Sequence, residues 1–264
     1  METNNVFSFQ RLILLGKQFW IIYKKMIGIM LPGFAGILFI VLILLQSMGN
    51  FQKWENHDYM GIFTILFLSW GFIIAGYSYP GFRNKEKSMA YLMLPASASE
   101  KFVFEFLTRI VVFIFLMPLF FWVVANLEGI FVHSLVPGFE HYSFSLAETW
   151  SEINYQLHYD GWNKFAMMQG CLFVFIAAFT GASHFSKSPV LKTMLVFSIF
   201  VAGYAFFTFI LVKGLNLRDF HPANDRILFI KNWHDTIAPL AIGLTVINMC
   251  LLAIAYFRLK EKEA

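Results

Sequence analysis

Six long apolar stretches, separated by short polar segments, dominate this chain of 264 residues. A helix needs about 20 mostly apolar residues to cross the hydrocarbon core of a bilayer, and it satisfies its own backbone hydrogen bonds there. The sequence therefore predicts an all-α, polytopic membrane protein with six transmembrane helices in a single transmembrane domain, residues 1–264. The predicted spans are residues 27–46, 60–79, 102–126, 165–183, 193–212 and 237–257.

The composition excludes an ordinary soluble domain. Hydrophobic residues make up 58% of the chain, charged residues only 14%, and there are 33 Phe. A soluble fold of this length would expose large apolar patches, whereas lipid tails solvate such side chains without penalty. The net charge of +4 is modest, and we interpret it as topology information, with no nucleic-acid partner expected.

The distribution of Lys and Arg predicts the orientation. If the amino terminus is cytoplasmic and the loops alternate, the 20 Lys and Arg divide 14 to 6 in favour of the cytoplasmic side. Such an excess in short loops is the positive-inside bias. Six spans then place the carboxyl terminus, with its basic RLKEKEA tail, in the cytoplasm as well.

Residues 6–26 have the pattern of an amphipathic helix that precedes the first span. Basic residues, among them Arg11 and Lys17, lie away from the apolar face, as in a helix lying among anionic lipid headgroups. Two interpretations stay open: a membrane anchor, or an interfacial helix that also contacts a cytoplasmic partner. The apolar face consists of Leu12, Leu15, Phe19, Ile22 and Met26.

The loop between the second and third spans, residues 80–101, carries the most information. A short apolar patch lies between charged residues, and it either folds back on the bilayer or inserts into a groove on a partner, where Met side chains adapt well. We prefer partner docking. The spacing of Ser97 and Glu100 predicts a capping box that starts the third helix near Ala98. The predicted docking residues here are Lys87, Met89, Tyr91, Leu92, Met93, Leu94 and Pro95.

Ionisable residues within the predicted spans are few. Glu105 and Arg109 are one turn apart on the third span, which predicts an ion pair that reduces the cost of placing each charge in the membrane. A gating or inter-subunit contact is the functional alternative. Small residues predict close helix packing around Ala177, Ala178 and Gly181, and between Ser198 and Ala202.

The arrangement of these segments resembles the permease subunit of a type-2 ATP-binding-cassette (ABC) exporter. The stretch KSMAYLMLPASASEKF also resembles a segment of such permeases from Bacteroidetes-type bacteria. The resemblance implies a bacterial inner membrane, two permease copies per transporter, and an ATPase partner. It also implies that the ATPase contacts residues around Arg11–Lys25 and Lys87–Pro95, and that short re-entrant helices lie within Asn216–Trp233.

No G-x-x-x-x-G-K-[ST] motif occurs in the sequence, so ATP hydrolysis is expected on a separate polypeptide. We expect no catalytic residue, cofactor or metal in this chain. Six of the seven His fall on the predicted outer side without metal-ligand spacing, and we interpret them as ordinary loop residues. The alternative function is a membrane-embedded enzyme or assembly factor without an ATPase partner.

Overall fold

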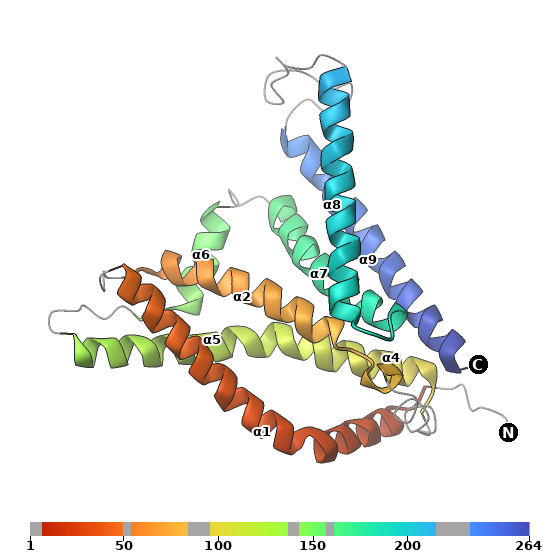
Figure 1. Ribbon diagram of the computed structural model, residues 1–264, viewed down its shortest axis with the longest axis horizontal. Helices are drawn as coiled ribbons and strands as arrows, with labels where there is room; N and C mark the ends of the chain where they lie inside the picture. Colours follow the sequence, from red (N-terminus) through yellow and green to blue (C-terminus); the bar gives the residue numbers. More distant parts are fainter. Residues whose placement is uncertain are drawn as a thin grey trace. The chain divides into compact units, whose positions relative to one another are not determined.

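The computed structural model describes residues 7–49, 54–83, 96–136, 143–156, 161–214 and 233–263. Every regular element in these ranges is a helix (Figure 1). The elements are α1 (Phe9–Met48), α2 (Asn56–Gly76), η1 (Pro80–Arg83), α4 (Ala98–Phe106), the π-helical turn η2 (Leu107–Val111), α5 (Val112–Leu135), α6 (Leu146–Gln156), α7 (Gly161–His184), α8 (Pro189–Gly214) and α9 (Trp233–Glu263).

The prediction of six transmembrane helices is confirmed. Within the described residues, six helices are long and apolar enough to cross a membrane. The third candidate is the continuous run Ala98–Leu135, which extends well beyond the predicted end at residue 126. This difference matters because Glu128, two residues beyond the predicted end of the span, lies inside the third helix.

The described contacts divide the chain into two compact units. Unit 1 comprises Met1–Gly71 and Met93–Gln156, and unit 2 comprises Phe72–Leu92 and Leu157–Ala264. The helix α2 contributes to unit 1 as far as Gly71 and to unit 2 from Phe72.

In unit 1 the first and third candidate spans run parallel, and α2 runs antiparallel to them. Phe34 of α1 stacks on Phe120 of α5, with ring centroids 5.2 Å apart. Further along both helices, Phe39 meets Phe131 at 5.3 Å. Along α2 the order is reversed, because Phe63 contacts Phe121 whereas the later Phe67 contacts Phe113. This alternation is what successive membrane crossings require.

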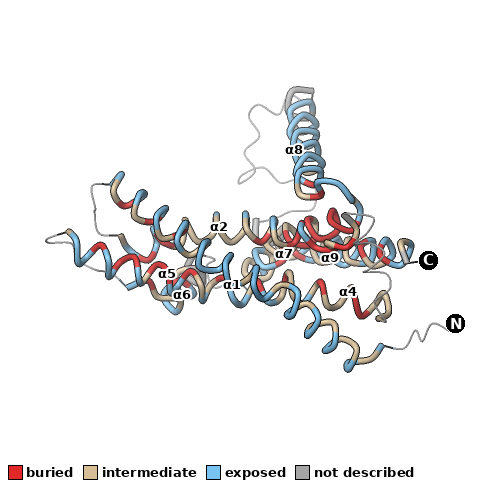
Figure 2. The backbone as a smooth tube through the Cα atoms, turned by 60° about the horizontal axis from the view of Figure 1, so that its bottom comes forward, coloured by how far each residue is buried: buried red, intermediate tan, exposed pale blue. Residues whose placement is uncertain are grey.

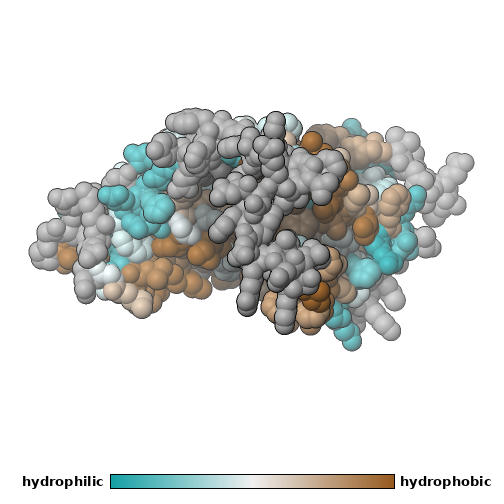
Figure 3. Space-filling model, turned by 90° about the horizontal axis from the view of Figure 1, so that it is seen from above, coloured by the Kyte–Doolittle hydropathy of each residue, from teal (hydrophilic) through white to brown (hydrophobic). Residues whose placement is uncertain are grey.

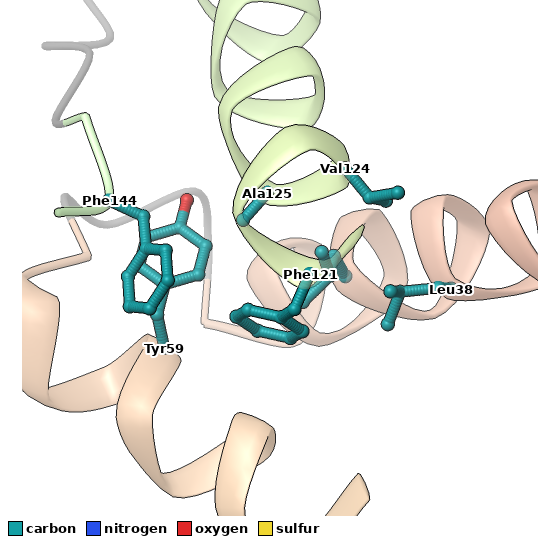
Figure 4. Close-up of a cluster of buried hydrophobic side chains, with 7 residues drawn as sticks. Leu38, Tyr59, Phe121, Val124, Ala125 and Phe144 are labelled. Carbon is teal, nitrogen blue, oxygen red and sulfur yellow. The ribbon is translucent and has the colours of Figure 1, made fainter. Parts of the chain in front are cut away.

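The core of unit 1 lies where α1, α2 and α5 meet. Figure 4 shows the ring of Tyr59 beside that of Phe144, with Phe121 of α5 close by. Tyr59 and Phe121 are also part of a network of aromatic contacts, since Phe144 lies 5.3 Å from Phe121 and 5.7 Å from Tyr59 between ring centroids. The buried members of this cluster are Leu38, Leu42, Tyr59, Phe121, Val124, Ala125 and Phe144.

The helix α1 is one continuous element of 40 residues, so the predicted amphipathic segment and the first span form a single helix. At 1.5 Å per residue it is about 60 Å long, roughly twice the hydrocarbon thickness of a bilayer. The ribbon of α1 bends along its length (Figure 1). Pro32 lies inside it and lacks the N–H of one helical hydrogen bond.

In unit 2, polar contacts join α7 to α9. The amide of Asn248 donates to Oε1 of Gln169 at 2.9 Å. The hydroxyl of Thr180 donates to the carbonyl oxygen of Leu251 at 3.1 Å, and the ammonium of Lys262 to that of Ser183 at 2.7 Å. The partners advance together along both chains, so α7 and α9 run parallel, as the fourth and sixth of six alternating spans should.

Small residues bring α7 against α8, as the sequence predicted for Ala178 and Gly181. Ala178 is fully buried. A Cβ atom added to Gly181 would lie 1.9 Å from Oγ1 and 2.9 Å from Cβ of Thr193 in α8. Ser198 and Ala202 are exposed instead, and no described helix packs on them within unit 2.

The helix α8 is exposed along nearly its whole length, in contrast to the buried end of α7 (Figure 2). Large apolar side chains point outward on all its sides, for example Phe200 at 75% and Tyr204 at 74% exposure. Apolar side chains also form broad patches on the described surface in Figure 3. A helix that is apolar all round suits contact with lipid or with another membrane helix.

Candidate functional site

The predicted docking residues from Lys87 to Pro95 lie outside the described residues. The segments on either side of this loop are described, and each belongs to a different unit. The two flanks are therefore held by contacts within two different units.

The segment that leads into the loop is anchored within unit 2. Tyr79 is 1% exposed, has a positive φ of 55°, and places its ring 5.1 Å from that of Phe179. A positive φ is uncommon for a residue with a side chain and requires support from its surroundings. The η1 turn follows, and the ammonium of Lys262 lies over the ring of Phe82 at 4.6 Å. The carboxyl-terminal end of α9 thus contacts the start of the loop.

The segment that leaves the loop is anchored within unit 1 by Glu100. The predicted capping box is confirmed: α4 begins at Ala98, the backbone N–H of Ser97 donates to Oε2 of Glu100 at 2.9 Å, and the backbone N–H of Glu100 donates to Oγ of Ser97 at 3.4 Å. The side chain of Glu100 is completely buried.

Glu100 also holds the amino-terminal helix. Its Oε1 atom accepts the backbone N–H of Ser8 at 2.6 Å and the guanidinium Nη2 of Arg11 at 3.1 Å. Arg11, which the sequence assigned to partner contact, therefore forms an intramolecular ion pair, and Lys17 is exposed. This carboxylate therefore joins the start of α1 to Ser97, which follows the undescribed part of the loop.

The predicted Glu105–Arg109 pair is confirmed. Nε of Arg109 lies 3.4 Å from Oε2 of Glu105, and the guanidinium lies over the ring of Phe19 at 5.6 Å. Arg109 is in the π-helical turn η2, where the hydroxyl of Thr108 donates to the carbonyl oxygen of Phe104 at 2.8 Å. A π turn widens the helix and often occurs where a side chain has to be placed specially.

A second buried polar cluster was missed by the sequence interpretation. Gln46, Tyr59 and Glu128 are each no more than 2% exposed. Nε2 of Gln46 donates to the hydroxyl of Tyr59 at 3.3 Å, and this hydroxyl donates to Oε2 of Glu128 at 3.2 Å. Glu128 is therefore a further buried ionisable residue inside the third candidate span, beyond the Glu105–Arg109 pair.

Helical spacing in the sequence would have indicated that Glu128 belongs to the third span and lies on its buried face. Phe121, Ala125, Glu128 and Val132 recur every three or four residues and form one buried face of α5. The sequence interpretation ended the span at residue 126 because the hydropathy falls there. The apolar residues of α5 continue to Leu135, so this one carboxylate interrupts a span without ending it.

Polar contacts extend from this end of unit 1 to α6. The side-chain amide of Asn56 donates to the hydroxyl of Thr149 at 3.0 Å and to Oε2 of Glu152 at 3.4 Å. Its oxygen accepts the backbone N–H of Ser145 at 3.1 Å. The start of α2 is thereby fixed against the start of α6.

Replacing Tyr59 with Phe is expected to lower the free energy of unfolding by about 1.5 kcal/mol, because Gln46 and Glu128 lose their common hydrogen-bond partner in a dry environment. Reversible denaturation in mixed micelles measures the change. Tyr23→Phe is the control: the half-buried ring of Tyr23 lies 4.6 Å from that of Phe19, and a change below about 0.5 kcal/mol is expected. Equal effects of the two substitutions would contradict the role given to the Tyr59 hydroxyl.

The described residues contain no group of three or more His, Cys, Asp or Glu able to hold a metal ion. Of the predicted re-entrant segment Asn216–Trp233, residues 216–232 lie outside the described residues, and Trp233 begins α9.

No protein-family model, curated protein or solved structure matches this chain.

Proposed function

We propose that this protein is the membrane-spanning permease subunit of an ABC exporter and that a separate ATPase subunit drives it. The observation that carries the proposal is the contact of Glu100 with Ser8, Arg11 and Ser97. It holds the start of α1 beside the end of the 80–101 loop. A partner that binds one of these segments would therefore contact the other.

The anchoring of the loop supports this proposal. Its two flanks are held by buried or ring-stacked side chains, Tyr79 and Phe82 before it and Glu100 after it. An anchored flank reduces the conformational entropy that the adjoining apolar segment loses when it enters a partner groove. The apolar side chains between them, Tyr91 and Leu92 among others, supply the contact area.

The asymmetry of Lys and Arg supports a cytoplasmic position for this loop, where ATP is available. By resemblance, two permease copies form one transporter in a bacterial inner membrane, and the exposed face of α8 suits contact with lipid or with a second copy.

The double substitution of Tyr91 and Leu92 by Asp is expected to abolish association with the ATPase, because it places two carboxylates in the apolar contact. The protein is purified in mild detergent from its native host, and co-eluting chains are identified. The parent should elute with a stoichiometric Walker-motif ATPase. Tyr91→Phe with Leu92→Met keeps the surface apolar and should retain the partner.

Two results would contradict the proposal. A parent protein that elutes without any ATPase favours the alternative, a membrane-embedded enzyme or assembly factor. Undiminished co-elution of the Asp variant shows that the partner binds elsewhere.

A further inference from the structure

The two carboxylate oxygens of Glu128 differ in their hydrogen bonding. Its Oε2 accepts from the hydroxyl of Tyr59, whereas its Oε1 has no partner in the described part of the chain. The Oε1 atom of Gln46 likewise lacks a partner, although Nε2 of the same amide donates to that Tyr59 hydroxyl. Two orphan acceptor oxygens thus belong to side chains that share one hydroxyl, and both side chains are fully buried.

Buried polar atoms in folded proteins almost always have partners, so such a pair of acceptors indicates a missing donor. Within the described residues, no basic side chain donates to either oxygen. The cluster around Tyr59 is aromatic and aliphatic, the nearby acids of α2 and α6 are Asp58, Glu148 and Glu152, and His57 of α2 is exposed. His133, farther along α5, is exposed. An ionised Glu128 would therefore be an uncompensated charge among apolar side chains.

We propose that Gln46, Tyr59 and Glu128 form a buried proton-binding site in which Oε1 of Glu128 carries the proton. The neutral acid then donates from Oε1 toward the orphan amide oxygen of Gln46 and accepts from Tyr59 through Oε2. One proton supplies the missing donor and removes the charge. A metal ion fits less well, because it prefers about six oxygen ligands and only two oxygens are left unpartnered here.

This proton-binding site in unit 1 does not depend on the proposal that the protein is a permease subunit. It joins α1, α2 and α5 at the end of unit 1 remote from Glu100. In the topology predicted from the charges this end faces outward, so the proton would exchange with the outer side. Loss of the proton would leave a buried carboxylate bonded to Tyr59, whose ring packs against Phe144, and would favour separation of the three helices.

Infrared spectroscopy of the full-length protein in lipid nanodiscs at neutral pH tests the proposal. The parent should show the carbonyl stretch of a protonated carboxylic acid, shifted in heavy water, and E128Q should lack it. E105Q is the matched control, since Glu105 is also buried but pairs with the cation of Arg109; that variant should keep the band. A folded parent without the band, or a band that persists in E128Q, would overturn the proposal.

Thermal unfolding provides a second readout. A Gln amide reproduces the protonated acid, since its oxygen accepts from Tyr59 and its NH₂ donates to Gln46. The melting temperature of E128Q should therefore stay within about 2 °C of the parent, whereas that of E105Q should fall further. A metal-ion site is the competing outcome: if sodium or potassium chloride raises the melting temperature of the parent but not of E128Q, the proton assignment is wrong.

Discussion

Replacing Glu100 with Ala is expected to lower the free energy of unfolding by about 3 kcal/mol, near the lower end of the range for breaking a buried ion pair. The substitution removes the acceptor of the backbone N–H groups of Ser8 and Ser97 and the counter-ion of Arg11. Arg11 retains 28% exposure of its side chain and can regain water, which keeps the loss moderate. Reversible denaturation in mixed micelles measures the effect.

The exposed pair of Arg258 and Glu261 provides the control. Its side chains are 46% and 63% exposed, so Glu261→Ala should change the free energy of unfolding by less than about 1 kcal/mol. Glu100→Gln keeps an acceptor without the charge and should lie between the two. If Glu100→Ala is as mild as Glu261→Ala, then Glu100 does not hold α1 against α4.

Substituting Gly181 by Ala should lower the free energy of unfolding by about 2 kcal/mol through overpacking. The added methyl group would lie 1.9 Å from Oγ1, 2.9 Å from Cγ2 and 2.9 Å from Cβ of Thr193. Rotation of the Thr193 side chain cannot relieve all three contacts, because Cβ does not move with χ1. The helices α7 and α8 must therefore move apart.

Gly170 of the same helix is the matched control. A Cβ atom there meets nothing within 4 Å, so Gly170→Ala should stabilise α7 by about 0.5–1 kcal/mol, the usual gain in helix propensity. The two Gly→Ala changes should thus have opposite signs in the same assay. Adding Thr193→Gly to Gly181→Ala should recover part of the loss. Destabilisation by the Gly170 variant as well would point to a general intolerance of α7.

The sequence was sufficient for the features that depend on local chemistry. Hydropathy over about 20 residues identified the six helices, and the Ser97–Glu100 spacing identified the start of α4 because a capping box is formed within one turn. The Glu105–Arg109 pair followed from helical spacing alone.

Contacts between distant segments could not be read from the sequence. The pairing of Arg11 with Glu100 joins residues that are far apart in the chain, and the basic pattern near Arg11 is equally typical of a helix that faces lipid headgroups. Glu128 was missed because a hydropathy average treats a single acid as the end of a span, whereas the periodicity of α5 continues past it. The docking residues Lys87–Pro95 stay a prediction.

The helix α1 has one further mechanical consequence. It is fixed near its first turn, where Ser8 and Arg11 meet Glu100, and near its last, where Gln46 meets Tyr59. A helix held at two points about 57 Å apart along its axis, at 1.5 Å per residue, acts as a rod. A force applied by a partner at the first turn must either increase the bend or be transmitted to Gln46. In this geometry α1 connects a force at its first turn with the Tyr59 hydrogen bonds at its last turn.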